Sequence, residues 1–196
     1  MDTFAKAYQV LLDDETYGMM RKRFIAFDTE ITGLQPTTDR IVELGAVEFI
    51  NGQPGRSFSS LVNPGMFIRP SSENVNHISN EMLKTAPREP EAYRAFLDFL
   101  GDAYQGETLL CAHNAKVDFT FFVQALNRCR YNAQFYYIDT LSLSREYLPG
   151  MPDYKQVTLA EELGIVNEDA HRASSDAEVC GKIMWHILDA YHEKQE

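Results

Sequence analysis

The sequence contains little cysteine, and its cysteines lack the spacings in which they usually act together. Among 196 residues only Cys111, Cys129 and Cys180 occur, and none belongs to a C-x-x-C pair. Each lies in a stretch that reads as apolar or helical, which does not fit a disulfide framework. We therefore expect free thiols and a reducing, intracellular setting.

Long uninterrupted apolar runs are also missing. Charged residues such as Lys6 and Asp13 interrupt the first twenty residues, so these lack the apolar centre of a signal peptide. No later run approaches the length of about 20 residues that a membrane-spanning helix requires. The sequence predicts a cytoplasmic protein without a membrane partner.

Positive charge is scarce as well. Eighteen Lys and Arg residues stand against 29 Asp and Glu residues, which gives a formal net charge of -11. This balance argues against a tight, non-specific binder of duplex nucleic acid, because such binding depends on Lys and Arg. It is compatible with a protein whose carboxylates hold divalent cations.

The length and the hydrophobic content of 44% are typical of a soluble globular protein with one main domain. In the first twenty residues, Phe4, Tyr8, Leu11 and Leu12 have roughly helical spacing. The sequence therefore predicts an N-terminal helical extension over residues 1–20, followed by the main domain over residues 21–196.

Strand and helix signals alternate along the rest of the chain. Three strands come first, with the turn dipeptide Asn51-Gly52 between the second and third, and strands and helices then alternate. This order predicts an α/β fold with a mixed five-stranded sheet flanked by helices. The predicted strands are 24–30, 41–50, 57–62, 109–112 and 135–138. The predicted helices are 92–104, 115–128, 158–163 and 175–191.

Two carboxylates stand out on the first predicted strand. Asp28 and Glu30 are two residues apart, so they share one face of the strand, and Thr29 points the other way. The rest of the strand is apolar and typical of a central, buried strand. Solvated charges on an edge strand are the alternative, but acids at the end of a buried strand favour a metal site.

Three further residues could join this site, although each has a simpler explanation. Asp118 and Asp176 each fall near the start of a predicted helix, where an acid stabilises the helix dipole. His171 lies in a predicted loop, where a histidine often has no catalytic role. It is the order and spacing of the whole set that suggest a shared site.

Four segments carry this set in order: FDTEITGL (27–34), HISNEML (77–83), AHNAKVDF (112–119) and HRASSDA (171–177). Together they closely resemble the motifs of the DEDDh, or DnaQ-like, 3′-5′ exonucleases, a family that includes the proofreading subunit of bacterial replicative DNA polymerases. The resemblance implies a ribonuclease-H-like fold, and it covers the chain from about Arg23 to Leu188.

The resemblance also implies the roles of the catalytic residues. Asp28, Glu30, Asp118 and Asp176 would hold two divalent cations, Mg²⁺ or Mn²⁺, on the scissile phosphate. His171 would be the general base that accepts a proton in the hydrolysis, since its ordinary pKa lies near neutrality.

The same motifs imply where the terminal nucleotide binds. Leu34 would wedge against a base, and Gly33 would let the strand end approach closely. Asn114 is expected chiefly to cap a helix or support the site. The sequence departs from the family at Ile31, where a second Thr is usual, and around His77. The full set of expected substrate-binding residues is Ile31, Thr32, Gly33, Leu34, His77 and Asn114.

The expected activity is removal of nucleoside monophosphates from the 3′ end of DNA, as single strands or frayed ends, in proofreading or repair. A DNA polymerase or another protein is a possible partner. Two alternatives remain open. One is an exonuclease for RNA or short oligonucleotides, because the metals do not read the 2′-hydroxyl. The other is a non-catalytic nucleic-acid-binding module, which the intact set of five residues disfavours.

Overall fold

The strands of this chain form one mixed sheet. The computed structural model describes residues 4–167 and 172–195, and within those ranges six strands join in the order β1-β6-β5-β2-β3-β4. The pairs β2–β3 and β3–β4 are antiparallel, whereas the pairs β1–β6, β6–β5 and β5–β2 are parallel. The strands are β1 (Ala5–Gln9), β2 (Arg23–Ile31), β3 (Ile41–Ile50), β4 (Gln53–Leu61), β5 (Leu110–Ala112) and β6 (Ala133–Asp139).

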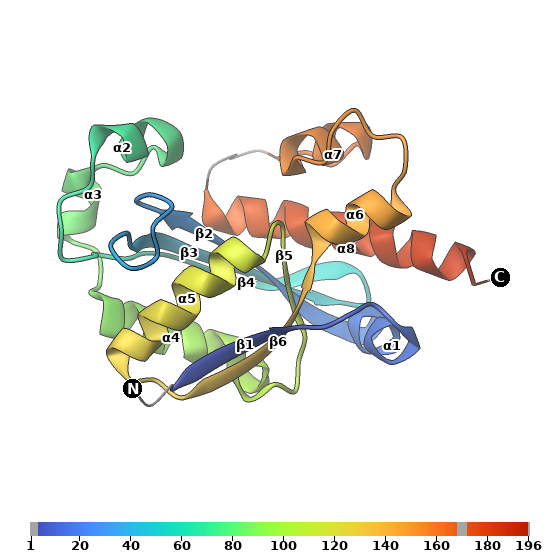
Figure 1. The fold of residues 1–196 in the computed structure, drawn as a ribbon, viewed down its shortest axis with the longest axis horizontal. Coiled ribbons are helices and arrows are strands. Elements are labelled where there is room, and N and C mark those ends of the chain that lie inside the picture. Colours follow the sequence, from blue (N-terminus) through green and yellow to red (C-terminus); the bar gives the residue numbers. More distant parts are fainter. Residues whose placement is uncertain (1–3, 168–171, 196) are drawn as a thin grey trace.

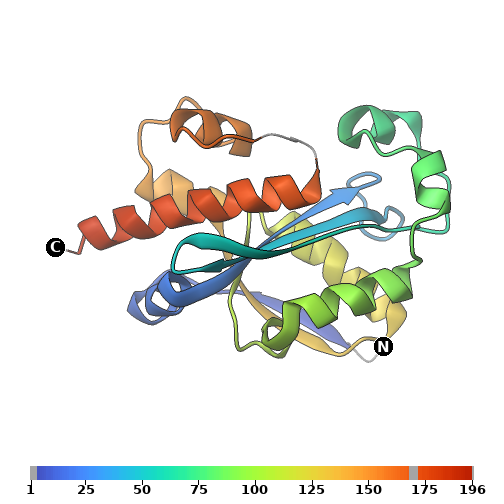
Figure 2. The same cartoon turned by 180° about the vertical axis from the view of Figure 1, so that it is seen from behind.

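Helices cover both faces of the sheet. Figures 1 and 2 show the twisted sheet between α8 on one side and α4 and α5 on the other. This arrangement confirms the predicted α/β, ribonuclease-H-like class. The helices are α1 (Asp14–Lys22), α2 (Pro70–Asn76), α3 (Asn80–Lys84), α4 (Glu89–Leu100), α5 (Lys116–Cys129), α6 (Thr140–Tyr147), α7 (Gln156–Glu162) and α8 (Ala173–Glu193), with a 3₁₀ turn, η1, at Gly101–Gln105.

Strand β2 runs through the middle of the sheet and contributes to both cores. Ile25 and Phe27 pack into the core beneath α4 and α5, whereas Phe24 and Ala26 pack into the core beneath α8. Because side chains alternate along a strand, this pattern directs Asp28 to the α8 side. The prediction that this strand is central and buried is confirmed.

The turn between β3 and β4 is the predicted hairpin. Asn51 and Gly52 have φ angles of 50° and 78°, the left-handed conformation that a two-residue hairpin turn requires. A side chain at Gly52 would also collide with the ring of Trp185 on α8. The three strands predicted first, β2, β3 and β4, therefore form an antiparallel meander.

The prediction for the N-terminal residues is wrong in part. Residues 5–9 form strand β1 rather than a helix, and the helix α1 begins only after the N-cap Asp13, whose side chain accepts from the Thr16 N–H. The cause is tertiary: the Asn127 side chain accepts from the Ala5 N–H at 2.8 Å and donates to the Ala5 carbonyl. The boundary between residues 1–20 and 21–196 stays a prediction.

Strand β1 also corrects the predicted strand number. It pairs in parallel with β6, so the sheet has six strands within the described residues instead of the expected five. Helices α2, α3 and α6 were not predicted either. Cys111, Cys129 and Cys180 are free, as expected. Across the described ranges, no helix combines the length and apolar character needed to cross a bilayer.

Candidate active site

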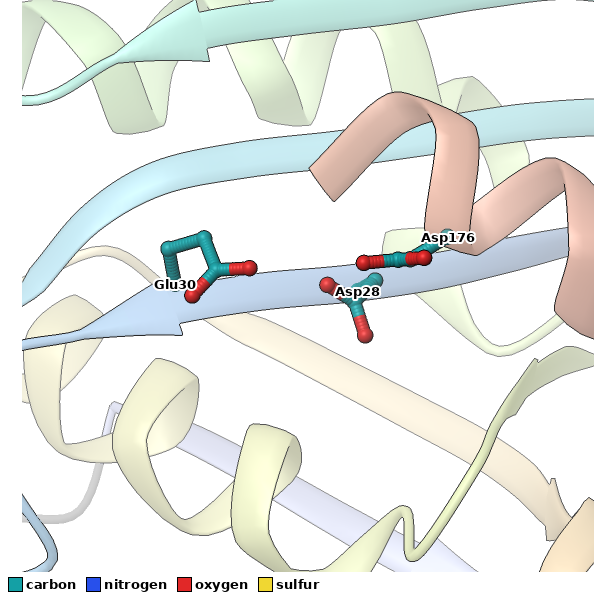
Figure 3. A group of neighbouring side chains, drawn as sticks. All are labelled: Asp28, Glu30 and Asp176. Atoms are coloured by element: carbon teal, nitrogen blue, oxygen red, sulfur yellow. The ribbon is translucent and has the colours of Figure 1, made fainter. Parts of the chain in front are cut away.

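Three predicted carboxylates meet at one place. Asp28 and Glu30 project from β2, and Asp176 projects toward them from the first turn of α8 (Figure 3). Each offers a carboxylate oxygen, and these oxygens lie within 4.8 Å of one another. The structure thus brings together residues separated by almost 150 positions, as the motif order predicted.

The start of α8 is fixed against β3. Arg172 donates through Nη2 to Oε1 of Glu43 at 2.7 Å, and the Ala173 N–H donates to the other oxygen of Glu43 at 3.2 Å. Gly45 lets the helix approach closely, since a Cβ built there would lie 2.0 Å from the carbonyl carbon of Ala173. The Asp176 N–H donates to the Arg172 carbonyl. This docking therefore sets the position of Asp176 over β2.

Asp118 approaches β2 from the opposite face. Strand β5 pairs with β2 only at residues 25 and 26, so the edge of β2 beyond them is open to the first turn of α5. There Oδ1 of Asp118 accepts from the Thr29 N–H at 3.1 Å and from the Thr29 hydroxyl at 2.7 Å. Thr29 points away from Asp28, as predicted, and holds Asp118 beside the cluster.

The acids of the cluster have raised pKa values, because they are buried close together with little positive charge nearby. Burial first, and then the charges of Asp118 and the other acids, raise the pKa of Asp28 well above its usual range. Burial and the charge of Asp176 raise the pKa of Glu30 to about 8. Burial also raises the pKa of Asp118, against the opposing effect of the hydrogen bonds from Thr29. A bound cation would relieve this repulsion.

The cluster opens into a pocket of about 350 Å³. On one side lie the acids of β2 and α8, and on another lie residues at the start of α7. Asn167 belongs to the same pocket, and its amide donates to Oδ1 of Asp176 at 2.9 Å. The lining residues are Asp28, Thr29, Glu30, His113, Lys155, Gln156, Val157, Asn167 and Asp176.

The predicted substrate-binding residues after β2 differ in exposure. The Ile31 carbonyl accepts from the Ser72 hydroxyl at 3.2 Å, which ties the end of β2 to α2. Thr32 is buried, and at Gly33 a Cβ would meet the carboxylate of Asp39. Leu34 is 78% exposed. Leu34 is thus available to a ligand, whereas Gly33 is needed first for internal packing.

The other predicted residues fall in three different settings. His77 ends α2 in a left-handed conformation, with φ of 57°, and is exposed. Asn114 is exposed and left-handed, with φ of 61°. It precedes Ala115, which is the N-cap of α5, so the expected capping position is shifted by one residue. His171, the expected general base, lies outside the described residues.

Sequence reasoning missed several residues that shape this site. Glu43 is fully buried, and an acid inside the apolar run of residues 41–50 was a visible signal for a buried partner. The hydrogen bonds of Thr29 to Asp118 and the position of Lys155 in the pocket had no local signal. Each depends on elements that meet only in the folded chain.

Known proteins share this fold and this sequence pattern. The RNase_T exonuclease family model matches residues 25–184. The DNA polymerase III subunit epsilon of Treponema pallidum is 36% identical over 175 residues, which cover 88% of this chain and 79% of that protein. The 3′-5′ exonuclease DinG of Bacillus subtilis is 36% identical over 87% of this chain, but the match spans only 18% of DinG.

A solved structure agrees at the level of the fold. Exonuclease I of E. coli, in complex with a dT13 oligonucleotide, superposes with a TM-score of 0.74 at 16% identity, covering 89% of this chain and 42% of that one. The matched range 25–184 contains Asp28, Glu30, Asp118 and Asp176, all of which the motifs predicted. The chain therefore belongs to the exonuclease family and is a 3′-5′ exonuclease of the DnaQ-like group.

Proposed function

We propose that the chain removes nucleotides one at a time from the 3′ end of DNA, as single strands or frayed ends, and releases nucleoside 5′-monophosphates. The observation that carries this proposal is the meeting of Asp28, Glu30 and Asp176, with carboxylate oxygens within 4.8 Å, in an open pocket. The epsilon subunit is named for a DNA polymerase, and the exonuclease I structure holds a DNA oligonucleotide. Both favour DNA as the substrate class.

The residues present fit a site for two divalent cations. The donors are carboxylate oxygens, which suit Mg²⁺ or Mn²⁺, and the raised pKa values of Asp28 and Glu30 reflect burial and repulsion that such cations would offset. When bound, two such cations activate the attacking water and neutralise charge on the scissile phosphate. Asp28, Glu30 and Asp176 would hold one of them, and Asp118 would contribute to the second.

The protein's own groups would then orient the reaction. Thr29 keeps one oxygen of Asp118 occupied and so fixes the direction of its carboxylate. In the hydrolysis, the water oxygen bonds to phosphorus and the bond from phosphorus to the 3′-oxygen of the preceding nucleotide breaks. His171 is the proposed acceptor of the water proton, by its motif position. The 3′-oxygen of the preceding nucleotide, which stays in the strand, takes up a proton from solvent and becomes the new 3′-hydroxyl, and the terminal nucleotide is released as its 5′-monophosphate.

The test uses a 5′-labelled single-stranded DNA oligonucleotide, with a matched RNA strand alongside. We expect a ladder that shortens from the 3′ end in Mg²⁺ or Mn²⁺ and stops with a chelator. Asp28→Ala should abolish cleavage while circular dichroism shows a folded protein. Asp98→Ala, an exposed acid on α4, should retain full activity and serves as the control.

Other outcomes would change specific parts of the proposal. Label released first as a mononucleotide would mean attack from the 5′ end. RNA shortened much faster than DNA would replace the substrate while leaving the carboxylates in their roles. Cleavage that persists in excess chelator, or in a folded Asp28→Ala protein, would refute the metal site.

We also propose that the chain works with a DNA polymerase. The support is that the match to the epsilon subunit, which is named as a polymerase subunit, covers 79% of that relative. Binding of this chain to the polymerase of the same cell, measured by analytical size-exclusion chromatography, tests this. A complex that fails to form at micromolar concentrations would favour a protein that acts alone.

A further inference from the structure

One wall of the pocket has a composition unlike the rest. Lys155, Gln156 and Val157 line the same cavity as Asp28, Glu30 and Asp176, and they come from the cap and first turn of α7. Among the described residues that line this pocket, Lys155 is the one with a fixed positive charge. We call residues 155–157 the α7 wall.

Two hydrogen bonds pin the α7 wall to the catalytic elements. The Tyr154 carbonyl lies 2.8 Å from Nε2 of His113, and because a carbonyl can only accept, this nitrogen carries the proton. On the other side of Lys155, the Gln156 side chain donates to the Asp176 carbonyl at 3.0 Å. The wall is thus tied both to the segment before α5 and to the residue that carries one of the acids.

The Lys155 side chain is held only weakly. It is 77% exposed, and its Nζ lies 3.6 Å from Oδ2 of Asp153, longer than a hydrogen bond. An exposed pair of this kind contributes little to stability, because water and salt screen the attraction. The backbone at Lys155 is fixed, whereas its ammonium group can turn toward an anion in the pocket without losing a strong partner.

Val157 gives the wall an apolar surface. It lies on the first turn of α7, is 57% exposed, and lines the same pocket as the acids. An exposed apolar side chain beside an exposed, weakly paired ammonium group matches a nucleotide, which presents the apolar faces of its base and sugar next to a charged phosphate. Small ions would use the ammonium group but not the apolar surface.

We propose that the α7 wall is a binding subsite for the DNA strand, in which Lys155 pairs with a phosphate and Val157 packs against a sugar or base. The inference rests on the proposed function and names residues that the exonuclease motifs do not include. It also adds a positive charge, besides that of the proposed cations, at a pocket lined by acids in a chain with net charge -11. The positive charge of Lys155 lies at the pocket itself and does not depend on a basic surface elsewhere on the protein.

The test measures binding apart from catalysis. In an Asp28→Ala background, which is expected not to cleave, fluorescence anisotropy gives the affinity for a labelled single-stranded DNA in Mg²⁺ at several salt concentrations. Each phosphate contact contributes about 0.7 to the slope of log K against log salt on single strands. Lys155→Gln should therefore reduce the slope by about 0.7 and weaken binding by roughly 3- to 10-fold near 0.1 M salt.

Matched variants separate charge from other effects. Lys155→Arg keeps the charge and should restore most of the affinity and slope. Lys6→Gln changes an exposed lysine on the edge strand β1, which β6 and β5 separate from β2. This variant should alter neither the affinity nor the salt slope. Val157→Ser should weaken binding without changing the slope. In the otherwise wild-type enzyme, Lys155→Gln should raise KM and leave kcat within about twofold, since the contact is made equally before and during the reaction.

Two results would overturn the inference in distinguishable ways. If Lys155→Gln binds and responds to salt like Lys6→Gln while the wild-type chain degrades DNA, the subsite is wrong and the proposed function stands. If the wild-type chain neither cleaves nor binds DNA in Mg²⁺ or Mn²⁺, the proposed function fails and the inference fails with it.

Discussion

Gly45→Ala should disable the site without touching any of its acids. Gly45 is paired with Asp28 across β2 and β3, so its empty side-chain position faces the first turn of α8. An added Cβ would lie 2.0 Å from the carbonyl carbon of Ala173 and 2.2 Å from the Ser174 nitrogen. Both are backbone atoms, which a change of side-chain rotamer cannot move away. The start of α8 must therefore shift.

The size of the shift follows from the contact distances. Ordinary contact begins at 3.4 Å, so the backbone of α8 must retreat by about 1.4 Å at its closest point. Asp176 lies three residues further on and moves with it. A misplacement of about 1 Å can lower a rate by roughly 100-fold. Overpacking of this kind typically destabilises a protein by about 1–3 kcal/mol. A loss of about 2 kcal/mol, the middle of this range, lowers the Tm of a chain of this length by roughly 4–8 °C.

The assay compares Gly45→Ala with Gly55→Ala, a glycine-to-alanine change on the neighbouring strand β4. At Gly55 the nearest atom to a new Cβ is the Glu48 carbonyl oxygen at 3.4 Å, so this variant should behave like the wild type. We expect Gly45→Ala to lose about 100-fold in kcat and to bind Mn²⁺ more weakly, measured well below its Tm. Wild-type activity and Mn²⁺ affinity in Gly45→Ala would refute the idea that β3 positions Asp176 through α8.

Three further changes test other parts of the structure. Thr29→Val removes the hydroxyl that donates to Asp118 and should cost about 1.5–3 kcal/mol in denaturant unfolding, whereas Thr29→Ser should stay close to the wild type; equal losses would contradict this role. The pKa of Glu30 is raised to about 8 without metal, so the folded chain holds a proton that the unfolded chain releases near its ordinary value of 4.5. The stability that Glu30 contributes is fully present below pH 4.5 and is lost as pH rises through 8. Because Mg²⁺ binds the deprotonated carboxylate, added Mg²⁺ should raise Tm more at pH 8.5 than at pH 6, and an equal rise in Tm at both pH values in thermal melts would contradict this. Gly18→Ala, in a helix with no atom within 4 Å of the new Cβ, should raise stability by about 0.5–1 kcal/mol, and a lower Tm would show hidden strain.

The parts of the site that could be predicted depend on local rules. The period of two along β2 was enough to place Asp28 and Glu30 on one face with Thr29 on the other, and the structure confirms it. The turn at residues 51 and 52 and the first-turn position of Asp118 are equally local. Their agreement with the structure follows from backbone geometry that tertiary contacts do not override.

The parts that could not be predicted depend on partners far away in the sequence. Residues 5–9 carry no strong strand pattern, and they form β1 because β6 offers a free edge and Asn127 satisfies their backbone groups. Lys155 enters the pocket because Gln156 reaches the Asp176 carbonyl. In both cases the decisive hydrogen bond joins residues that no local pattern relates, so periodicity alone gives no information about it.

Buried and half-buried acids in this fold differ in whether arginine balances their charge, and the difference helps to indicate which of them serve a cation. Glu48 accepts from Arg23 and Arg56, and these hydrogen bonds hold its pKa below the usual range. Glu43 is likewise matched, by Arg172. The pKa values of Asp28 and Glu30 are raised instead, because burial and neighbouring acids outweigh the positive charge nearby. Arginine thus balances the charges of Glu43 and Glu48, whereas Asp28 and Glu30 repel each other and need a positive charge from outside the protein, which a bound cation supplies.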